Sequence, residues 1–121
     1  MIGYVTLGTN DIEKSKAFYD ALTAELGGKR TFSNERMQGY GSKAGAMLAV
    51  CTPHDGKPAT VGNGTMFSFA APSTELVDKV YARAIALGAK DEGASGARID
   101  TFYGAYFRDP DGNKLCVFKA G

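Results

Sequence analysis

Long apolar runs are missing from this 121-residue sequence. No stretch of about 18 apolar residues is available to span a bilayer. The N-terminus also lacks the charged and then apolar pattern of a signal peptide. These absences predict a cytoplasmic protein with no membrane partner.

An excess of one charge is missing as well. The sequence has 14 Lys and Arg residues against 13 Asp and Glu residues, and its longest basic cluster is Lys29-Arg30. Binding to nucleic acid needs a concentrated basic surface. We therefore expect no nucleic-acid partner.

Cysteine and histidine are scarce, and tryptophan is absent. Cys51 and Cys116 lack C-x-x-C spacing, so neither a zinc knuckle nor a redox motif is indicated, and free thiols are predicted in a reducing cytosol. The one histidine, His54, lies in a stretch rich in Gly and Pro. Two roles stay open for His54: a solvated loop residue, or a contact or general base at the rim of a cleft.

The residues that are present predict one compact domain, or two small fused halves. Residues 2–9 alternate in the manner of a strand, and Asn10 with Glu13 can form a capping box for a following helix. Its apolar stripe ends at Gly27-Gly28. The first half therefore begins with a strand and an amphipathic helix.

The second half repeats this order. A strand is predicted over residues 65–70, followed by a helix that starts at Pro72-Ser73 and ends at Gly88. "ELGGKR" and "ALGAKD" close the two helices in similar ways. Each helix precedes three β-like stretches, about 29–33, 36–42 and 46–52 in the first half and about 90–94, 97–108 and 113–119 in the second.

An internal βαβββ repeat explains this pattern best. The prediction is a single α+β domain over residues 1–121, with module 1 at about 1–53, a linker at about 54–63 and module 2 at about 64–121.

The sequence "DPDGN" at 109–113 carries strong turn chemistry, because Pro presets φ and Gly supplies a positive φ. The turn fixes the register of the strand after it. Leu115 and Val117 then share one face, which we expect to pack on a helix. Lys114, Cys116 and Phe118 share the other.

With this repeat, the chain resembles the vicinal oxygen chelate superfamily, which includes glyoxalase I, the bleomycin-resistance proteins and the extradiol dioxygenases. The resemblance is carried by "YVTLGTNDIEKSKAFYDAL", "DGKPATVGNGTMFSFAA" and "YGAYFRDPDGNKLCVF". It implies that the two modules form an incomplete eight-stranded barrel around a cleft. In metal-dependent members, four strand positions supply the ligands, and here they correspond to Tyr4, Ala49, Met66 and Cys116.

These four residues differ from the His, Glu or Gln that such members use. Ala49 has no donor atom, the Met66 thioether suits copper(I), and a tyrosine phenol has a pKa of about 10. Only Cys116 is a credible ligand. The alternatives are a soft-metal site of Cys116 and Met66 or a cleft without a metal, and the second is predicted, with no metal and no cofactor.

The cleft is then predicted to bind a small organic molecule, as the metal-free branch of the superfamily does. Aromatic and methionine surfaces supply the affinity. The lining residues expected from strand alternation and the resemblance are Tyr4, Thr6, Met47, Ala49, Cys51, Met66, Ser68, Cys116 and Phe118.

Five residues of the middle strands could add contacts, although each is as readily an exposed strand residue: Arg36, Tyr40, Arg98, Tyr103 and Tyr106. Cys116 has two readings of its own, a small buried hydrophobe or a nucleophile whose pKa Lys114 lowers. No catalytic residue is assigned.

Two functions stay open. The first is a metal-independent binding protein, expected as a homodimer because the family commonly pairs modules across subunits. The second is a glyoxalase-like lyase, isomerase or dioxygenase with a rebuilt metal site or a metal-free mechanism. Drug-sequestering members tend to have an acidic groove with tryptophan, which this sequence lacks.

Overall fold

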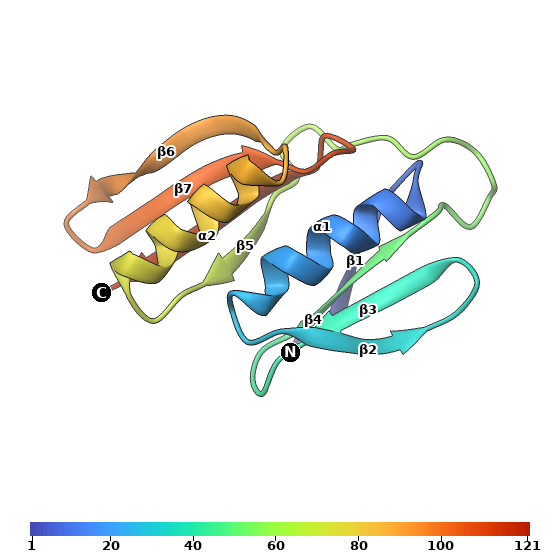
Figure 1. The fold of residues 1–121 in the computed structure, drawn as a ribbon, viewed down its shortest axis with the longest axis horizontal. Helices are drawn as coiled ribbons and strands as arrows, with labels where there is room; N and C mark the ends of the chain where they lie inside the picture. Colours follow the sequence, from blue (N-terminus) through green and yellow to red (C-terminus); the bar gives the residue numbers. More distant parts are fainter. The chain divides into compact units, whose positions relative to one another are not determined.

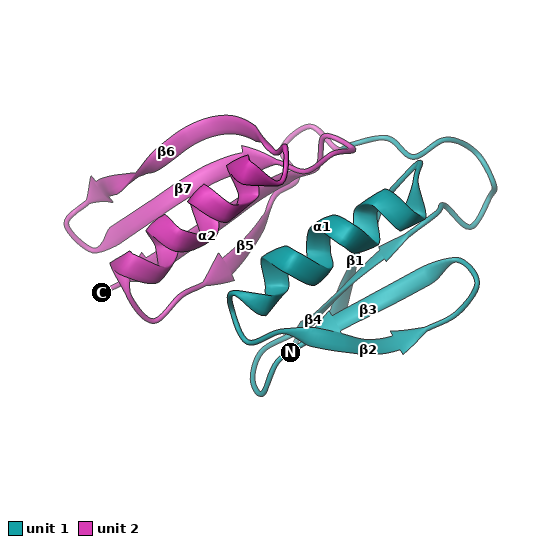
Figure 2. Ribbon diagram, in the orientation of Figure 1, with its two compact units in different colours: residues 1–61 teal, residues 62–121 magenta.

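The structure is a computed structural model that describes residues 1–121. The chain divides into two compact units, Met1–Val61 and Gly62–Gly121 (Figure 2). Each unit contains one four-stranded sheet and one helix (Figure 1). No helix has the length and apolarity that crossing a bilayer requires.

The first unit runs β1 (Tyr4–Gly8), α1 (Ile12–Ala24), β2 (Lys29–Ser33), β3 (Met37–Gly41) and β4 (Met47–Cys51). Its strand order is β1-β4-β3-β2, with β1 parallel to β4 and the other pairs antiparallel. Helix α1 covers one face of this sheet (Figure 1). The core between them contains Leu7, Phe18, Leu22, Leu48 and Val50.

The second unit repeats the arrangement with β5 (Phe67–Ala70), α2 (Thr74–Ala86), β6 (Lys90–Ile99), β7 (Phe102–Arg108) and β8 (Lys114–Ala120). Its order is β5-β8-β7-β6, again with one parallel pair at the edge. Leu115 and Val117 are buried in the core with Val77, Val80 and Phe107, as predicted. The α+β class and the tandem βαβββ order are therefore confirmed.

The helix starts agree with the sequence in one module only. Helix α2 starts next to Pro72-Ser73 as predicted, and the Ser73 side chain caps it by accepting a bond from the Leu76 amide. In α1 the cap is Asp11, whose carboxylate accepts from the Lys14 amide at 3.1 Å, so the prediction of Asn10 was wrong. The Asn10 side chain instead bonds both backbone groups of Ala59. This pair of bonds holds the segment after β4 against the start of α1.

The strand limits were wrong in one place. The prediction broke a strand near residues 95–96 and ran the next one from 97 to 108, whereas β6 continues to Ile99 and the reversal lies at Asp100-Thr101. Register shifts on either side of Gly93 and Gly96 absorb the glycines within β6. An isolated glycine in a strand can mark either a bulge or the end of the strand. Only the pairing with the neighbouring strand shows which of the two is present.

Tyr40 joins β3 to α1. Its hydroxyl lies 2.8 Å from Asp20 Oδ1 and 3.2 Å from the Lys16 carbonyl oxygen. Asp20 also accepts two bonds from Arg30, whose guanidinium lowers the pKa of the carboxyl. Burial, and then the bond to Asp20, raises the pKa of Tyr40 well above its ordinary value.

This shift predicts an alkaline loss of stability. As pH rises past about 10, the unfolded state releases the phenol proton before the folded state does, so the free energy of unfolding falls. One such group contributes a slope of at most about 1.4 kcal/mol per pH unit. Urea unfolding of Tyr40→Phe at several alkaline pH values should show a shallower decline than the unmodified protein.

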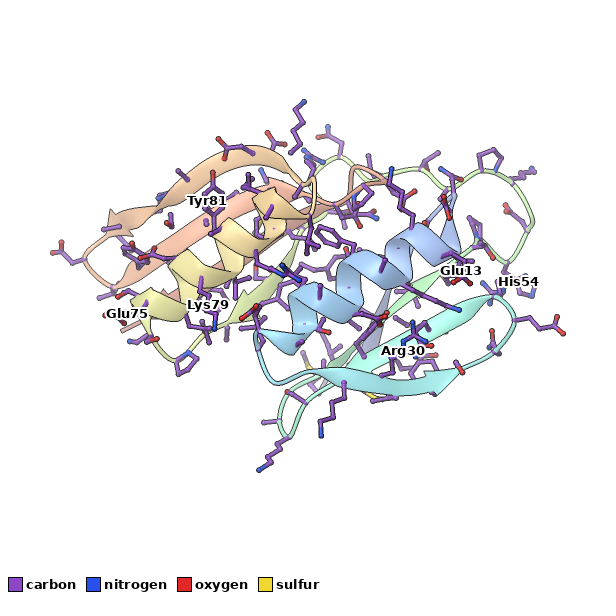
Figure 3. The ribbon with its side chains drawn as sticks, in the orientation of Figure 1. Glu13, Arg30, His54, Glu75, Lys79 and Tyr81 are labelled. Atoms are coloured by element: carbon purple, nitrogen blue, oxygen red, sulfur yellow. The ribbon has the colours of Figure 1, made fainter.

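Tyr81→Phe provides the comparison. The Tyr81 hydroxyl bonds Asp91 across to β6, and this bond raises its pKa at a more accessible position (Figure 3). Solvent screens that interaction. Tyr81→Phe should therefore alter the alkaline decline in the free energy of unfolding less than Tyr40→Phe does. Equal declines in the unmodified protein and Tyr40→Phe would contradict the prediction.

Candidate functional site

Each sheet has one face turned away from its helix, and we call these the first and second helix-free faces. In the first unit, the β1–β4 register pairs Tyr4 with Met47 and Thr6 with Ala49. Cross-strand partners share a face, so these residues lie opposite the core. Cys51 follows on the same side of β4 and is buried.

An aromatic pair covers part of the first helix-free face. The rings of Tyr4 and Phe32 meet edge to face with centroids 5.8 Å apart. Gly39 leaves the space for Phe32, because a Cβ there would lie 2.6 Å from that ring. Tyr4 is 55% exposed, so this aromatic surface is accessible.

The second helix-free face centres on Cys116. The registers pair Cys116 with Ser68 of β5 on one side and with Tyr106 of β7 on the other. Cys116 is fully buried. Burial raises the pKa of its thiol, while hydrogen bonds to Ser68 and Tyr106 and the charges of Arg98 and Lys114 act in the opposite direction. The thiol is therefore protonated at neutral pH, and the nucleophile reading of Cys116 gains no support.

Two cations lie beside Tyr106. The Arg98 guanidinium carbon is 5.3 Å from the ring centroid, and Lys114 Nζ is 5.7 Å from it. Arg98 also donates to the carbonyl oxygens of Ala94 and Gly96, at 2.7 and 2.9 Å. The position of the guanidinium is thus set by its own strand and by the ring.

An aromatic stack lies further along the same two strands. The rings of Phe102 and Phe118 are nearly parallel, with an interplanar angle of 7° and centroids 5.1 Å apart. Gly104 lies between Phe102 and Tyr106 on β7 and pairs with Phe118. A Cβ on Gly104 would lie 2.8 Å from the Phe102 ring, so glycine keeps this part of the face flat.

Eight of the nine predicted cleft residues fall on strands of these two faces. The exception is Met66, which directly precedes β5 and is 41% exposed. Their role in binding stays a prediction. The first face holds Tyr4, Thr6, Met47, Ala49 and Cys51, and the second holds Ser68, Cys116 and Phe118.

The five additional candidates separate clearly. Tyr40 and Tyr103 turn toward the helices, where their hydroxyls bond Asp20 and Asp78. Arg36 donates to the Thr52 carbonyl oxygen. Arg98 and Tyr106 alone reach the second helix-free face in direct contact with each other.

His54 lies exposed in the loop after β4 (Figure 3). The same loop borders a cavity of about 380 Å³ lined by Thr9, Asn10, Thr52, Pro53, Gly56, Lys57 and Pro58. None of the predicted cleft residues lines it. The polar side chains of Thr9 and Asn10 already bond Asp11 and Ala59, so this cavity offers few free groups to a ligand.

Sequence reasoning missed Phe32, Phe102 and Gly104. The signal for Phe102 was hidden because one strand had been expected over 97–108, which left no reversal to set its face. Gly104 lies inside the strand predicted over 97–108, and nothing in the local sequence shows that the Phe102 ring packs against it.

The residues at the four family metal positions do not fit a metal ion. Ala49 offers no donor, and within either unit no three His, Cys, Asp or Glu side chains come together as a metal site. Structural and catalytic sites for these ions need three or four donors. The four positions therefore lack the donors that a metal site needs.

Comparison with known proteins identifies the family. The family model for the Glyoxalase/Bleomycin resistance protein/Dioxygenase superfamily matches residues 1–117. The crystal structure of a glyoxalase/bleomycin resistance protein from Albidiferax ferrireducens T118 is 43% identical, with a TM-score of 0.92, and the match covers 100% of this chain and 99% of that one. No curated protein matches the sequence.

More distant structures share the fold alone. A lactoylglutathione lyase from Agrobacterium tumefaciens is 23% identical, with a TM-score of 0.74 and coverage of 98% of this chain and 92% of that one. A fosfomycin resistance protein from Listeria monocytogenes is 19% identical, with a TM-score of 0.77 and coverage of 100% and 93%. The family match over nearly the whole sequence decides the assignment: the chain belongs to the glyoxalase/bleomycin resistance protein/dioxygenase superfamily.

Proposed function

We propose that the chain binds a small organic molecule on its helix-free faces and that binding needs no metal ion. The observation that carries the proposal is the set of side chains at the family's four metal positions, Tyr4, Ala49, Met66 and Cys116. One alkyl group, one thioether, one phenol and one buried thiol do not make the donor set that a hard or borderline cation needs.

The composition of both faces supports the same function. Ligand sites combine aromatic and apolar surface with a few polar groups that set orientation. The first face has the Tyr4–Phe32 pair beside Thr6, and the second has the Phe102–Phe118 stack. Ser68 and Tyr106 are the cross-strand partners of Cys116 on the second face.

A metal titration with a ligand screen tests this proposal. The purified protein, dialysed against Zn²⁺, Ni²⁺, Mn²⁺ or Fe²⁺, should retain less than one ion per chain by elemental analysis. A thermal-shift screen of flat organic compounds with EDTA present should give ligands that raise the melting temperature. At a concentration of 100 times Kd, a ligand adds about 2.7 kcal/mol to the free energy of unfolding.

Cys116→Ser makes the test sharper, because Cys116 is the one credible metal donor among the four positions. Serine is close to cysteine in size, and its hydroxyl is a poor soft-metal ligand. The variant should bind the screened ligands within a few-fold of the unmodified protein, as should the matched variant Cys51→Ser. Ligand binding that EDTA abolishes and a metal restores, with loss in Cys116→Ser alone, would overturn the proposal.

A further inference from the structure

The second helix-free face has an excess of positive charge. The four strands of its sheet contain two acidic residues, Asp91 and Glu92. Asp91 accepts bonds from the Tyr81 hydroxyl and the Gly93 amide, and the first of these turns it toward α2. Glu92 forms an ion pair with Arg108, which lowers the pKa of its carboxyl.

Arg98 and Lys114 form no ion pair. Their positive charges lie beside the same Tyr106 ring and near the Cys116 thiol. The backbone carbonyls that Arg98 bonds carry no net charge, so its cation is uncompensated. Lys114 also contributes to the low pKa of Glu92, although that carboxylate is bonded to Arg108. The face therefore has two cations beside Tyr106 that no carboxylate neutralises and that can bind an anion.

We infer that the second helix-free face takes an organic oxyanion with a flat apolar body. The oxyanion lies at Arg98 and Lys114, and the body extends along the face past Tyr106 to the Phe102–Phe118 stack. This inference rests on the proposed function and names the ligand class for that site. Carboxylates, sulfonates and phosphonates share the required chemistry, since each presents two or more oxygens to guanidinium and ammonium groups.

The dimensions of the face suit such a ligand. Lys114, Cys116 and Phe118 are alternate residues of β8, and four residues of strand span about 13 Å. Between the two ends lie Cys116 and its cross-strand partners, Ser68 on β5 and Tyr106 on β7. The Phe102 ring occupies the space beside Gly104, so the Phe102–Phe118 stack itself forms the apolar end of the face.

Probes that share one ring system and differ in charge test the inference directly. We would titrate the full-length protein by calorimetry with 2-naphthoate and naphthalene-2-sulfonate as anions, 2-naphthol as the neutral probe and 2-naphthylmethylammonium as the cation. The two anions should bind roughly tenfold more tightly than the neutral probe, as expected for two partly exposed charge contacts. The cation should bind most weakly, and added salt should weaken only the anions.

A pair of double variants assigns the effect to the face. Arg98→Gln with Lys114→Gln should reduce anion binding to the level of the neutral probe. Arg83→Gln with Lys119→Gln is the matched control, because it removes the same two charges from α2 and from the other side of β8. That control should retain the preference for anions.

The possible results separate the two proposals. Equal affinity for the anionic and neutral probes, or an equal loss of anion binding in both double variants, overturns the oxyanion inference and leaves metal-free binding in place. Failure of every probe to bind, together with a screen that yields no ligand in EDTA, overturns both. A preference for one of the two anions supports the inference and shows whether the face binds a carboxylate or a sulfonate better.

Discussion

Replacing Asp109 by alanine is expected to lower the free energy of unfolding by about 3 to 5 kcal/mol, a large part of the stability of an ordinary domain. The Asp109 carboxylate is buried, with 4% exposure. One oxygen accepts from the amides of Asp111 and Asn113, and the other accepts from Asn113 Nδ2, all at 2.9 Å. Alanine leaves three donors without this acceptor, and unsatisfied buried donors are costly.

The loss should also weaken the turn that sets the register of β8. The Asp109 amide bonds the Asn113 carbonyl oxygen, and Gly112 adopts a φ of 93° to close the loop. Urea unfolding of Asp109→Ala measures the cost. Asp55→Ala is the matched control, since Asp55 accepts one amide bond from Lys57 in an exposed turn, and it should change stability by less than about 1 kcal/mol. Similar losses in the two variants would contradict the prediction.

Phe107→Ala and Tyr106→Ala are neighbouring changes on β7 with opposite expected results. Phe107 is fully buried in the core under α2, so its truncation should cost about 3 to 5 kcal/mol of stability. Tyr106 is half-buried on the helix-free face beside Arg98 and Lys114. Its truncation should cost about 1 kcal/mol of stability, while naphthoate binding falls roughly tenfold as two cation–π contacts are lost.

Unfolding curves and calorimetric titrations of both variants would test this separation of roles. Tyr106→Phe serves as the control for the ring, because it keeps the π face and removes only the hydroxyl. It should retain most of the naphthoate affinity. Full affinity in Tyr106→Ala, or a loss of stability equal to that of Phe107→Ala, would show that the two faces do not divide in this way.

Much of the fold could be predicted from local sequence patterns, because turn residues and apolar stripes of this kind are each compatible with only one local structure. The turn residues at 109–113 set which side of β8 faces the helix, and Leu115 and Val117 are buried as that register requires. Pro72-Ser73 predicts the start of α2 because it directly precedes an apolar helical stripe. At the start of α1, Asn10 and Asp11 are both good caps, and the choice depends on the bonds that Asn10 makes with Ala59, far along the chain.

The candidate site was only partly predictable for the same reason. Strand alternation placed Cys116 and Ser68 on the helix-free side, since alternation is a local property. The position of Arg98 depends on bulges in β6 that change which side its residues face. Stacking of Phe102 on Phe118 depends on a reversal at Asp100-Thr101 that carries neither Gly nor Pro to mark it. Contacts that depend on such irregularities cannot be predicted from the local sequence and are visible only in the structure.

The last strands of the two modules, β4 and β8, are alike on one side and unlike on the other. Counting from the turn glycines Gly45 and Gly112, Leu48 and Val50 correspond to Leu115 and Val117, and all four are buried toward a helix. The alternate positions differ in kind: Met47, Ala49 and Cys51 in one copy stand where Lys114, Cys116 and Phe118 stand in the other. The side of β4 and β8 that packs on a helix is therefore apolar in both modules, whereas the opposite side is apolar throughout in β4 and begins with a charged residue in β8.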